Sequence, residues 1–224
     1  MNATRTAPAG GGLKTPTDGV RARAPYEMRP LNTDAERAAA AALVEDRARW
    51  LADRGIAVPY HHEAAYRDAW AEAVGLYEEN TDGEEVLVGC LLLNRQPDLR
   101  PGDADAEGPG LGISLVYTAP GRDDKVGWLI TLWASDFADR INASWVHAEV
   151  PSRHTGGGNT PGRLLNHLRS IGWLITGTGL SRDGEGVTRL RMTAQDRHGL
   201  AAMVHCTVPL QHTGKPEPKD EGPR

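Results

Sequence analysis

Ile113-Ser-Leu-Val-Tyr117 opens the stretch that decides the fold, and its β-branched and apolar residues predict a strand. It leads into Pro120-Gly-Arg-Asp-Asp-Lys-Val-Gly127, a turn rich in glycine and charge. From Trp128 to Arg140 the apolar residues return at helical spacing, which predicts a helix. A turn that enters a helix leaves main-chain N–H groups without intrahelical partners. These groups, together with the helix dipole, suit a pyrophosphate.

The same stretch continues as a second strand and a second helix. Residues 143–150 have strand character, and within them Trp145, His147 and Glu149 alternate onto one face. Residues 163–170 predict a helix that stops at a glycine-tryptophan pair. The whole stretch therefore reads strand, turn, helix, strand, loop, helix.

The flanking segments add further strands and helices. A strand over residues 26–31 precedes a helix that begins at the capping box Thr33-Asp-Ala-Glu36. Also expected are a helix over 63–74, strands over 75–79 and 86–93 joined by the turn Asn80-Thr-Asp-Gly83, and strands over 172–176, 188–194 and 201–208. The sum predicts an α+β fold, with helices on both sides of a mixed, mostly antiparallel sheet.

Composition restricts the number of domains and the class of partner. The chain has 224 residues, of which 39% are hydrophobic, so we expect one folded domain over 25–210, a disordered arm over 1–24 and a disordered tail over 211–224. A formal net charge of −5 argues against nucleic-acid binding. We expect no membrane span and no secretory signal. Cys90 and Cys206 give no disulfide framework, so a cytoplasmic protein is expected.

The order of elements over roughly residues 26–195 resembles the acetyl-CoA-binding core of the GNAT family of N-acyltransferases. In that family a strand ends in a turn of pattern R/Q-x-x-G-x-G/A, whose main-chain amides wrap the pyrophosphate of CoA. Arg122 takes the first position of this pattern and Gly127 the last. Lys125 stands where the middle glycine is usual, so the motif is matched only in part.

The resemblance implies acetyl-CoA as co-substrate and a GNAT-like sheet. It assigns CoA contacts to Arg122, Lys125, Val126 and Gly127. From the residues alone, the same segment can equally be an ordinary strand-to-helix turn, with Arg122 and Lys125 paired to the two aspartates between them. In the family this turn carries the acyl-CoA, while the amine acceptor, a small molecule or a peptide, binds nearby.

The resemblance also implies catalytic roles for the two central strands. A main-chain amide at Val116 or Tyr117 would bind the thioester carbonyl and stabilise the oxyanion. His147 or Glu149 would deprotonate the amine, directly or through water. The alternative for His147 is a structural histidine in a strand.

One family residue is absent. Many members carry a tyrosine four residues before the glycine-aromatic pair, where it protonates the leaving thiolate, and this chain has Leu168 there. Two hypotheses therefore stand: an active N-acyltransferase, or a catalytically degenerate GNAT-fold module that binds CoA or a protein partner. The sequence fixes neither the acceptor nor the acyl chain length, and it leaves a homodimer open.

Two groups of histidines could serve other roles. Tyr60-His-His62 could line the acceptor pocket or simply begin a helix in solvent. A zinc site is not expected, because the spacing of the remaining candidates contains no tight ligand pair. Those candidates are His198, His205, Cys206 and His212.

Overall fold

The structure is a computed structural model, which describes residues 24–56, 62–97, 108–122, 125–152, 161–181 and 184–211. The arm and the tail expected over residues 1–24 and 211–224 lie outside these ranges, except for Ala24 and Gln211. Within the described ranges, no helix has the length and apolar character needed to cross a membrane.

Eight strands form one sheet in the order β6-β7-β5-β4-β3-β2-β1-β8. They are β1 Tyr26–Pro30, β2 Glu72–Glu79, β3 Glu85–Asn94, β4 Gly110–Thr118, β5 Trp145–Pro151, β6 Leu174–Leu180, β7 Gly186–Thr193 and β8 Val204–Cys206. Two pairs of neighbours, β4·β5 and β1·β8, are parallel, and the other pairs are antiparallel. The expected mixed, mostly antiparallel sheet is confirmed.

Four α-helices and one short 3-10 helix accompany the sheet. They are α1 Asp34–Ala52, α2 His62–Arg67, α3 Lys125–Arg140, α4 Pro161–Ser170 and η2 Leu200–Ala202. The capping box at the start of α1 is present as expected. The N–H of Glu36 donates to Oγ1 of Thr33 at 3.2 Å, and the N–H of Thr33 donates to the Glu36 carboxylate at 3.0 Å.

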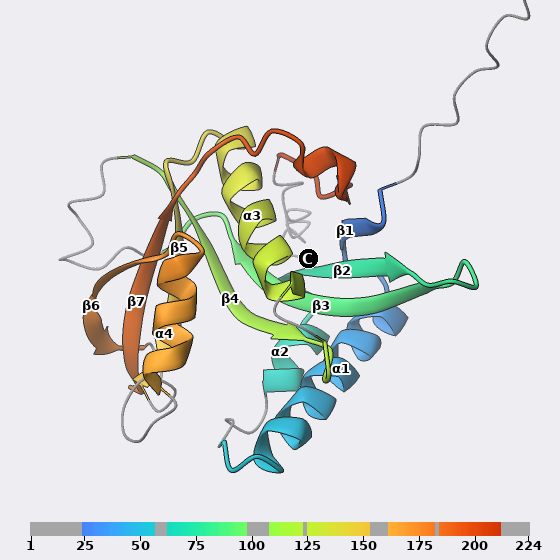
Figure 1. Cartoon of the computed structure of the whole chain (residues 1–224), viewed down its shortest axis with the longest axis horizontal. Coiled ribbons are helices and arrows are strands. Elements are labelled where there is room, and N and C mark those ends of the chain that lie inside the picture. The colour runs from blue at the N-terminus through green and yellow to red at the C-terminus, as the bar shows by residue number, and fades with distance from the viewer. Residues whose placement is uncertain are drawn as a thin grey trace, which may run out of the picture.

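Two apolar clusters hold the helices on opposite faces of the sheet (Figure 1). The larger one joins α3 and α4 to the sheet, with Trp133 and Phe137 of α3 stacked at its centre. The smaller one lies under α1 and α2 and includes Val44, Tyr66 and Cys90. The sheet is therefore covered from both sides near its middle.

The structure corrects three boundaries. The prediction of a helix over residues 63–74 was wrong, because α2 ends at Arg67 and β2 begins at Glu72. The four-residue spacing of Trp70 and Val74 was misleading, because Trp70 is 73% exposed while Val74 is buried in the sheet. Pairing of this segment with β1 and β3 outweighs its local periodicity.

The other two corrections concern the start of helix α3 and the length of the last strand. Helix α3 begins at Lys125 instead of Trp128, so part of the expected turn is the first helical turn. The last expected strand, over 201–208, shrinks to Val204–Cys206 because Leu200–Ala202 forms a 3-10 turn before it.

Candidate functional site

The two central parallel strands, β4 and β5, stay together for four residues and then part. Their register runs from Gly110 beside Trp145 to Ile113 beside Ala148. Beyond that point, within the described strands, β4 continues to pair with β3 and β5 continues to pair with β7. Figure 1 shows β4 curving toward β3 while β5 stays with β7. The main-chain groups that face the separation are thus left without a neighbouring strand.

A bulge in β4 lies where the strands part. Leu92 pairs with Ser114 and Cys90 pairs with Tyr117, so one residue of β3 faces two residues of β4. Leu115, one of those two residues, has a φ of 48°, a left-handed value that a leucine rarely adopts. The hydroxyl of Tyr66 in α2 donates to the carbonyl oxygen of Leu115, which anchors the bulge to the smaller apolar cluster.

The bulge distinguishes the two residues expected to stabilise the oxyanion. The N–H of Ala119 donates to the carbonyl of Val88 at 2.9 Å. Hydrogen-bonded pairs alternate along an antiparallel ladder, so the main-chain groups of Tyr117, two residues before Ala119, face β3. Val116 lies in the bulge, past the last β4·β5 pair, and its side chain is 41% exposed.

The start of α3 supplies main-chain donors near the end of β4. Lys125, Val126 and Gly127 form its first turn, where N–H groups have no intrahelical acceptors. The side chain of Val126 is buried in the larger cluster, whereas a Cβ on Gly127 would meet no atom within 4 Å. The region beside Gly127 is thus open to a ligand.

The two cations of the expected turn have protein contacts. Arg122 donates to the carboxylate of Glu78 in β2. The ammonium of Lys125 lies 5.8 Å from the centroid of the Tyr26 ring. The two aspartates with which these cations could have paired lie outside the described residues.

The two base candidates in β5 occupy different environments. A Cβ on Gly110 would lie 2.6 Å from Cδ2 of His147, so the imidazole packs on the main chain of β4, inside the paired region. Glu149 is the first residue beyond the last β4·β5 pair. Its carboxylate is 3.5 Å from Nε of Arg189 in β7, and its side chain is 45% exposed. Glu149 is therefore the more accessible of the two at the separation.

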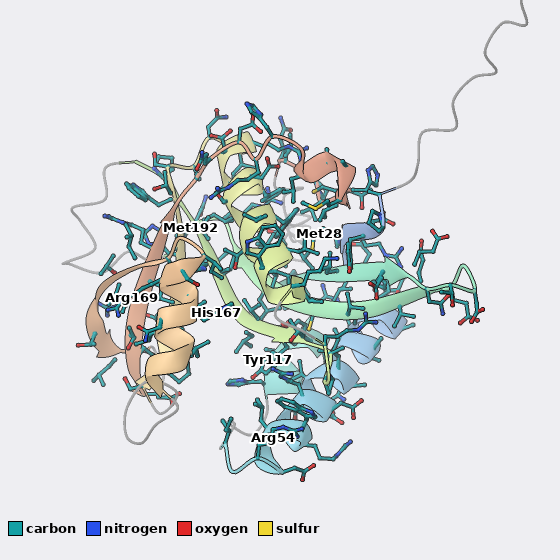
Figure 2. The ribbon with its side chains drawn as sticks, in the orientation of Figure 1. Met28, Arg54, Tyr117, His167, Arg169 and Met192 are labelled. Carbon is teal, nitrogen blue, oxygen red and sulfur yellow. The ribbon has the colours of Figure 1, made fainter. Side chains whose placement is uncertain are left out.

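Helix α4 carries the position at which the family has its tyrosine. Leu168 is half-buried and packs against the larger apolar cluster. Figure 2 shows His167 and Arg169 on opposite sides of α4, with His167 on the side toward β4. Neither the leucine nor its packing supplies a proton donor.

Sequence reasoning missed one side chain at this site. Nδ1 of His62, the first residue of α2, forms a hydrogen bond with the hydroxyl of Tyr117. Figure 2 shows Tyr117 near the end of β4, beside α2. The sequence indicates that Tyr60-His-His62 could line the acceptor pocket, but no local pattern indicates a contact with a residue 55 positions later.

Burial raises the pKa of two groups under α2. Desolvation holds the pKa of the Tyr66 phenol well above its usual value. Burial likewise raises the pKa of the Cys90 thiol to about 12. Both groups are therefore neutral near pH 7, and neither is a nucleophile.

No protein-family model and no curated protein matches the sequence. Among solved structures, the chain is similar to an inferred N-acetyltransferase from Lactobacillus plantarum, at 17% identity and a TM-score of 0.50, covering 76% of this chain and 99% of that one. It is also similar to a GNAT-family acetyltransferase from Listeria monocytogenes, at 13% identity and a TM-score of 0.49, covering 73% and 93%.

A third similar structure is an inferred acetyltransferase from Salmonella typhimurium with its cofactor acetyl-CoA, at 16% identity and a TM-score of 0.45, covering 78% of this chain and 97% of that one. At these identities the likeness is one of fold. The chain shares the fold of the Lactobacillus N-acetyltransferase structure, which agrees with the mixed, mostly antiparallel sheet that the sequence predicted.

Proposed function

We propose that this protein is an N-acyltransferase that moves an acetyl or other short acyl group from acyl-CoA to an amine. One observation carries the proposal: β4 and β5 part immediately before a bulge in β4. In this reaction the N–H of Val116, in the bulge beside the separation, would contact the acyl group. Such a main-chain donor suits a thioester carbonyl whose oxygen gains negative charge during acyl transfer.

The reaction would proceed by direct attack of the amine on the thioester carbonyl. A C–N bond forms, the C–S bond breaks, and the thiolate of CoA leaves and takes a proton from solvent. Glu149, the first residue of β5 beyond its pairs with β4, accepts the proton of the amine directly or through water. His147, packed on Gly110, is the second candidate for the base.

The first turn of α3 would hold the pyrophosphate of CoA. Main-chain N–H groups at the start of a helix suit phosphate oxygens, and the open space beside Gly127 admits them. Arg122 can leave its ion pair with Glu78 and bind a phosphate instead, because an ion pair at the surface contributes little to stability.

A second candidate function is a GNAT-fold module that binds CoA or a protein partner without catalysis. Leu168 favours it, since a leucine cannot protonate a thiolate. Lys125 favours it as well, because a side chain stands where the family has a glycine.

Two measurements test the proposal in sequence. Thermal unfolding with and without acetyl-CoA comes first, because a ligand that binds the native state raises the melting temperature. Release of CoA is then followed with a panel of small amines and peptide N-termini. A thermal shift with turnover supports the enzyme, and a shift without turnover on any amine favours the binding module. An unchanged melting temperature with acetyl-CoA would exclude both the enzyme and the CoA-binding module.

A further inference from the structure

The strands β5 and β7 carry a polar surface on the face of the sheet away from α3 and α4. Val146, Leu190 and Met192 are buried in the cluster beneath those helices. The residues between them alternate to the opposite face. The polar surface consists of His147 and Glu149 of β5 with Arg189 and Arg191 of β7.

Helices α1 and α2 do not cover this polar surface. The sheet residues in their apolar cluster come from β2, β3 and β4, and none comes from β5 or β7. Within the described residues, the polar surface adjoins the separation of β4 and β5 through Glu149 alone. In the proposed reaction, an acceptor bound on this surface would meet the thioester at the separation, beside Glu149.

The guanidinium of Arg189 is held in place but keeps open donors. Its Nε lies 3.5 Å from Oε1 of Glu149, and its side chain is 17% exposed. Its far end rests above the main chain of Gly179 in β6, where a Cβ would lie only 2.8 Å from Nη2. In the part of the chain that the structure describes, no acceptor meets Nη1 or Nη2.

Arg191 adds a second positive charge two residues along the same strand. Its guanidinium lies over the Trp145 ring, 4.1 Å from the ring centroid, in a cation–π contact. The polar surface thus carries two guanidinium groups against the single carboxylate of Glu149. Arg189 faces Glu149 and Arg191 faces His147, so this surface carries an excess of positive charge that favours a further anion.

We infer that Arg189 binds a carboxylate of the acceptor, so that the acceptor is an amino acid or another amine that carries a carboxylate close to its nitrogen. This inference rests on the proposed acyl transfer at the β4·β5 separation. Oε1 of Glu149 lies 3.5 Å from Nε of Arg189, and Nη2 of the same guanidinium extends beyond it toward Gly179 of β6. That spacing suits a molecule whose amine meets Glu149 while its carboxylate meets the Nη atoms of Arg189.

The glycines of β6 provide a matched pair of variants. In Gly179→Ala the new methyl group would collide with the far end of Arg189, which must move, while the flexible side chain allows the fold to survive. In Gly177→Ala the new Cβ meets no atom within 4 Å. Neither glycine has a positive φ, so alanine fits the backbone at both positions.

Turnover is measured with glycine and glycinamide, with L-leucine and L-leucinamide, and with aminomethylphosphonate. We expect kcat/KM to favour each carboxylate over its amide by about 10- to 100-fold, the effect of a charge-assisted hydrogen bond. Gly179→Ala should lose most of this preference, and Gly177→Ala should keep it. Equal rates for acid and amide would overturn the inference and leave acyl transfer intact. A phosphonate preferred over glycine would also overturn it.

Calorimetry provides a readout that does not need turnover. N-acetylglycine and N-acetyl-L-leucine are titrated into the whole chain, with their amides as controls. Tighter binding of the acids, weakened in Gly179→Ala but not in Gly177→Ala, supports the carboxylate site even if no amine is acylated. Equal binding of acids and amides in the wild type contradicts it.

Discussion

The hydroxyl of Tyr66 donates a hydrogen bond to the carbonyl oxygen of Leu115, and this bond joins α2 to the bulge in β4. Tyr66 is fully buried, and Leu115 holds the left-handed backbone conformation that the bulge requires. A left-handed leucine costs about 1–2 kcal/mol, so the surrounding contacts must hold it in place. The short helix α2 therefore supports the bulge that lies where β4 and β5 separate.

Removing this hydroxyl should affect both stability and the site. Tyr66→Phe leaves the Leu115 carbonyl without its side-chain donor, so we expect a loss of about 1–3 kcal/mol in the free energy of unfolding. Relaxation of the bulge would move the N–H of Val116, so kcat/KM should fall as well. Urea unfolding and CoA release measure the two effects.

Tyr26→Phe is the control, since its hydroxyl donates to Glu78 at 2.8 Å, in β2 and away from the bulge. A Tyr66→Phe protein with unchanged stability and rate would show that the bulge does not depend on α2.

The raised pKa of the Cys90 thiol leads us to expect a loss of stability at alkaline pH. Its pKa in the folded protein is about 12, above the value near 8.5 of an unfolded chain. Stability is therefore unaffected below pH 8.5 and falls as the pH rises toward 12, because only the unfolded chain ionises in that window. Between pH 8 and pH 10.5 ionisation of this thiol in the unfolded chain should lower the free energy of unfolding by about 2.5 kcal/mol.

Urea unfolding at the two pH values checks this expectation. Cys90→Ala should weaken the decline while lowering stability overall, because it leaves a cavity. Val88→Ala, a buried change in the same strand, should lower stability at both pH values and leave the decline unchanged. An equal decline in Cys90→Ala would assign the alkaline sensitivity to other groups.

The sequence predicted most of the sheet because local pattern and tertiary contact agree there. The apolar run from Ile113 to Tyr117 lies in β4, and the helical spacing after Trp128 belongs to α3. Helix α3 buries Leu129, Trp133 and Phe137 at helical spacing, and β4 buries Ile113. Around Trp70 and Val74 the local spacing favoured a helix, while pairing with two strands imposed β2.

The geometry of the candidate site was beyond the reach of the sequence. The bulge at Leu115 requires a left-handed residue, yet its sequence contains no glycine or asparagine to indicate one. The contact between His62 and Tyr117 and the seat of Arg189 on Gly179 join residues that only the sheet brings together. Such contacts leave no signal at short sequence separation.

A carboxylate at the start of α3 tests the pyrophosphate site. Gly127→Glu places a side chain in open space, so the fold should survive, while its negative charge would repel phosphate oxygens. We expect the affinity for CoA to fall by about tenfold or more. Calorimetry on the folded variant measures it. Gly127→Ala adds the Cβ without the charge and should bind CoA nearly as well as the wild type. Equal affinities in all three proteins would refute a pyrophosphate site at this turn.

Substitution of the two base candidates ranks them. If Glu149 accepts the proton of the amine, Glu149→Gln should lower kcat/KM by about 100-fold or more, with little change in CoA affinity. His147→Gln should have a smaller effect, because His147 packs on Gly110 inside the paired part of the strands. The full pH profile of both variants separates a lost base from a disturbed fold. A folded, fully active Glu149→Gln protein would remove Glu149 from this role.

Leu168 offers the test that separates an enzyme from a binding module. Its side chain is half-buried and packs against the larger apolar cluster. Leu168→Tyr should supply a hydroxyl that can protonate the leaving thiolate. We expect faster turnover in this variant at high pH, where the amine is free and solvent acid is scarce. CoA release between pH 7 and pH 10 measures the gain.

Arg169→Tyr is the matched control, because Figure 2 shows Arg169 on the side of α4 away from His167 and β4. The same hydroxyl at that exposed position should leave the rate unchanged. A gain confined to Leu168→Tyr means that α4 still lies beside the thioester sulfur and that the native protein works without a dedicated acid. If the wild type and Leu168→Tyr both bind acetyl-CoA and neither acylates any amine, the chain is a binding module, because restoring the missing donor has not restored the chemistry.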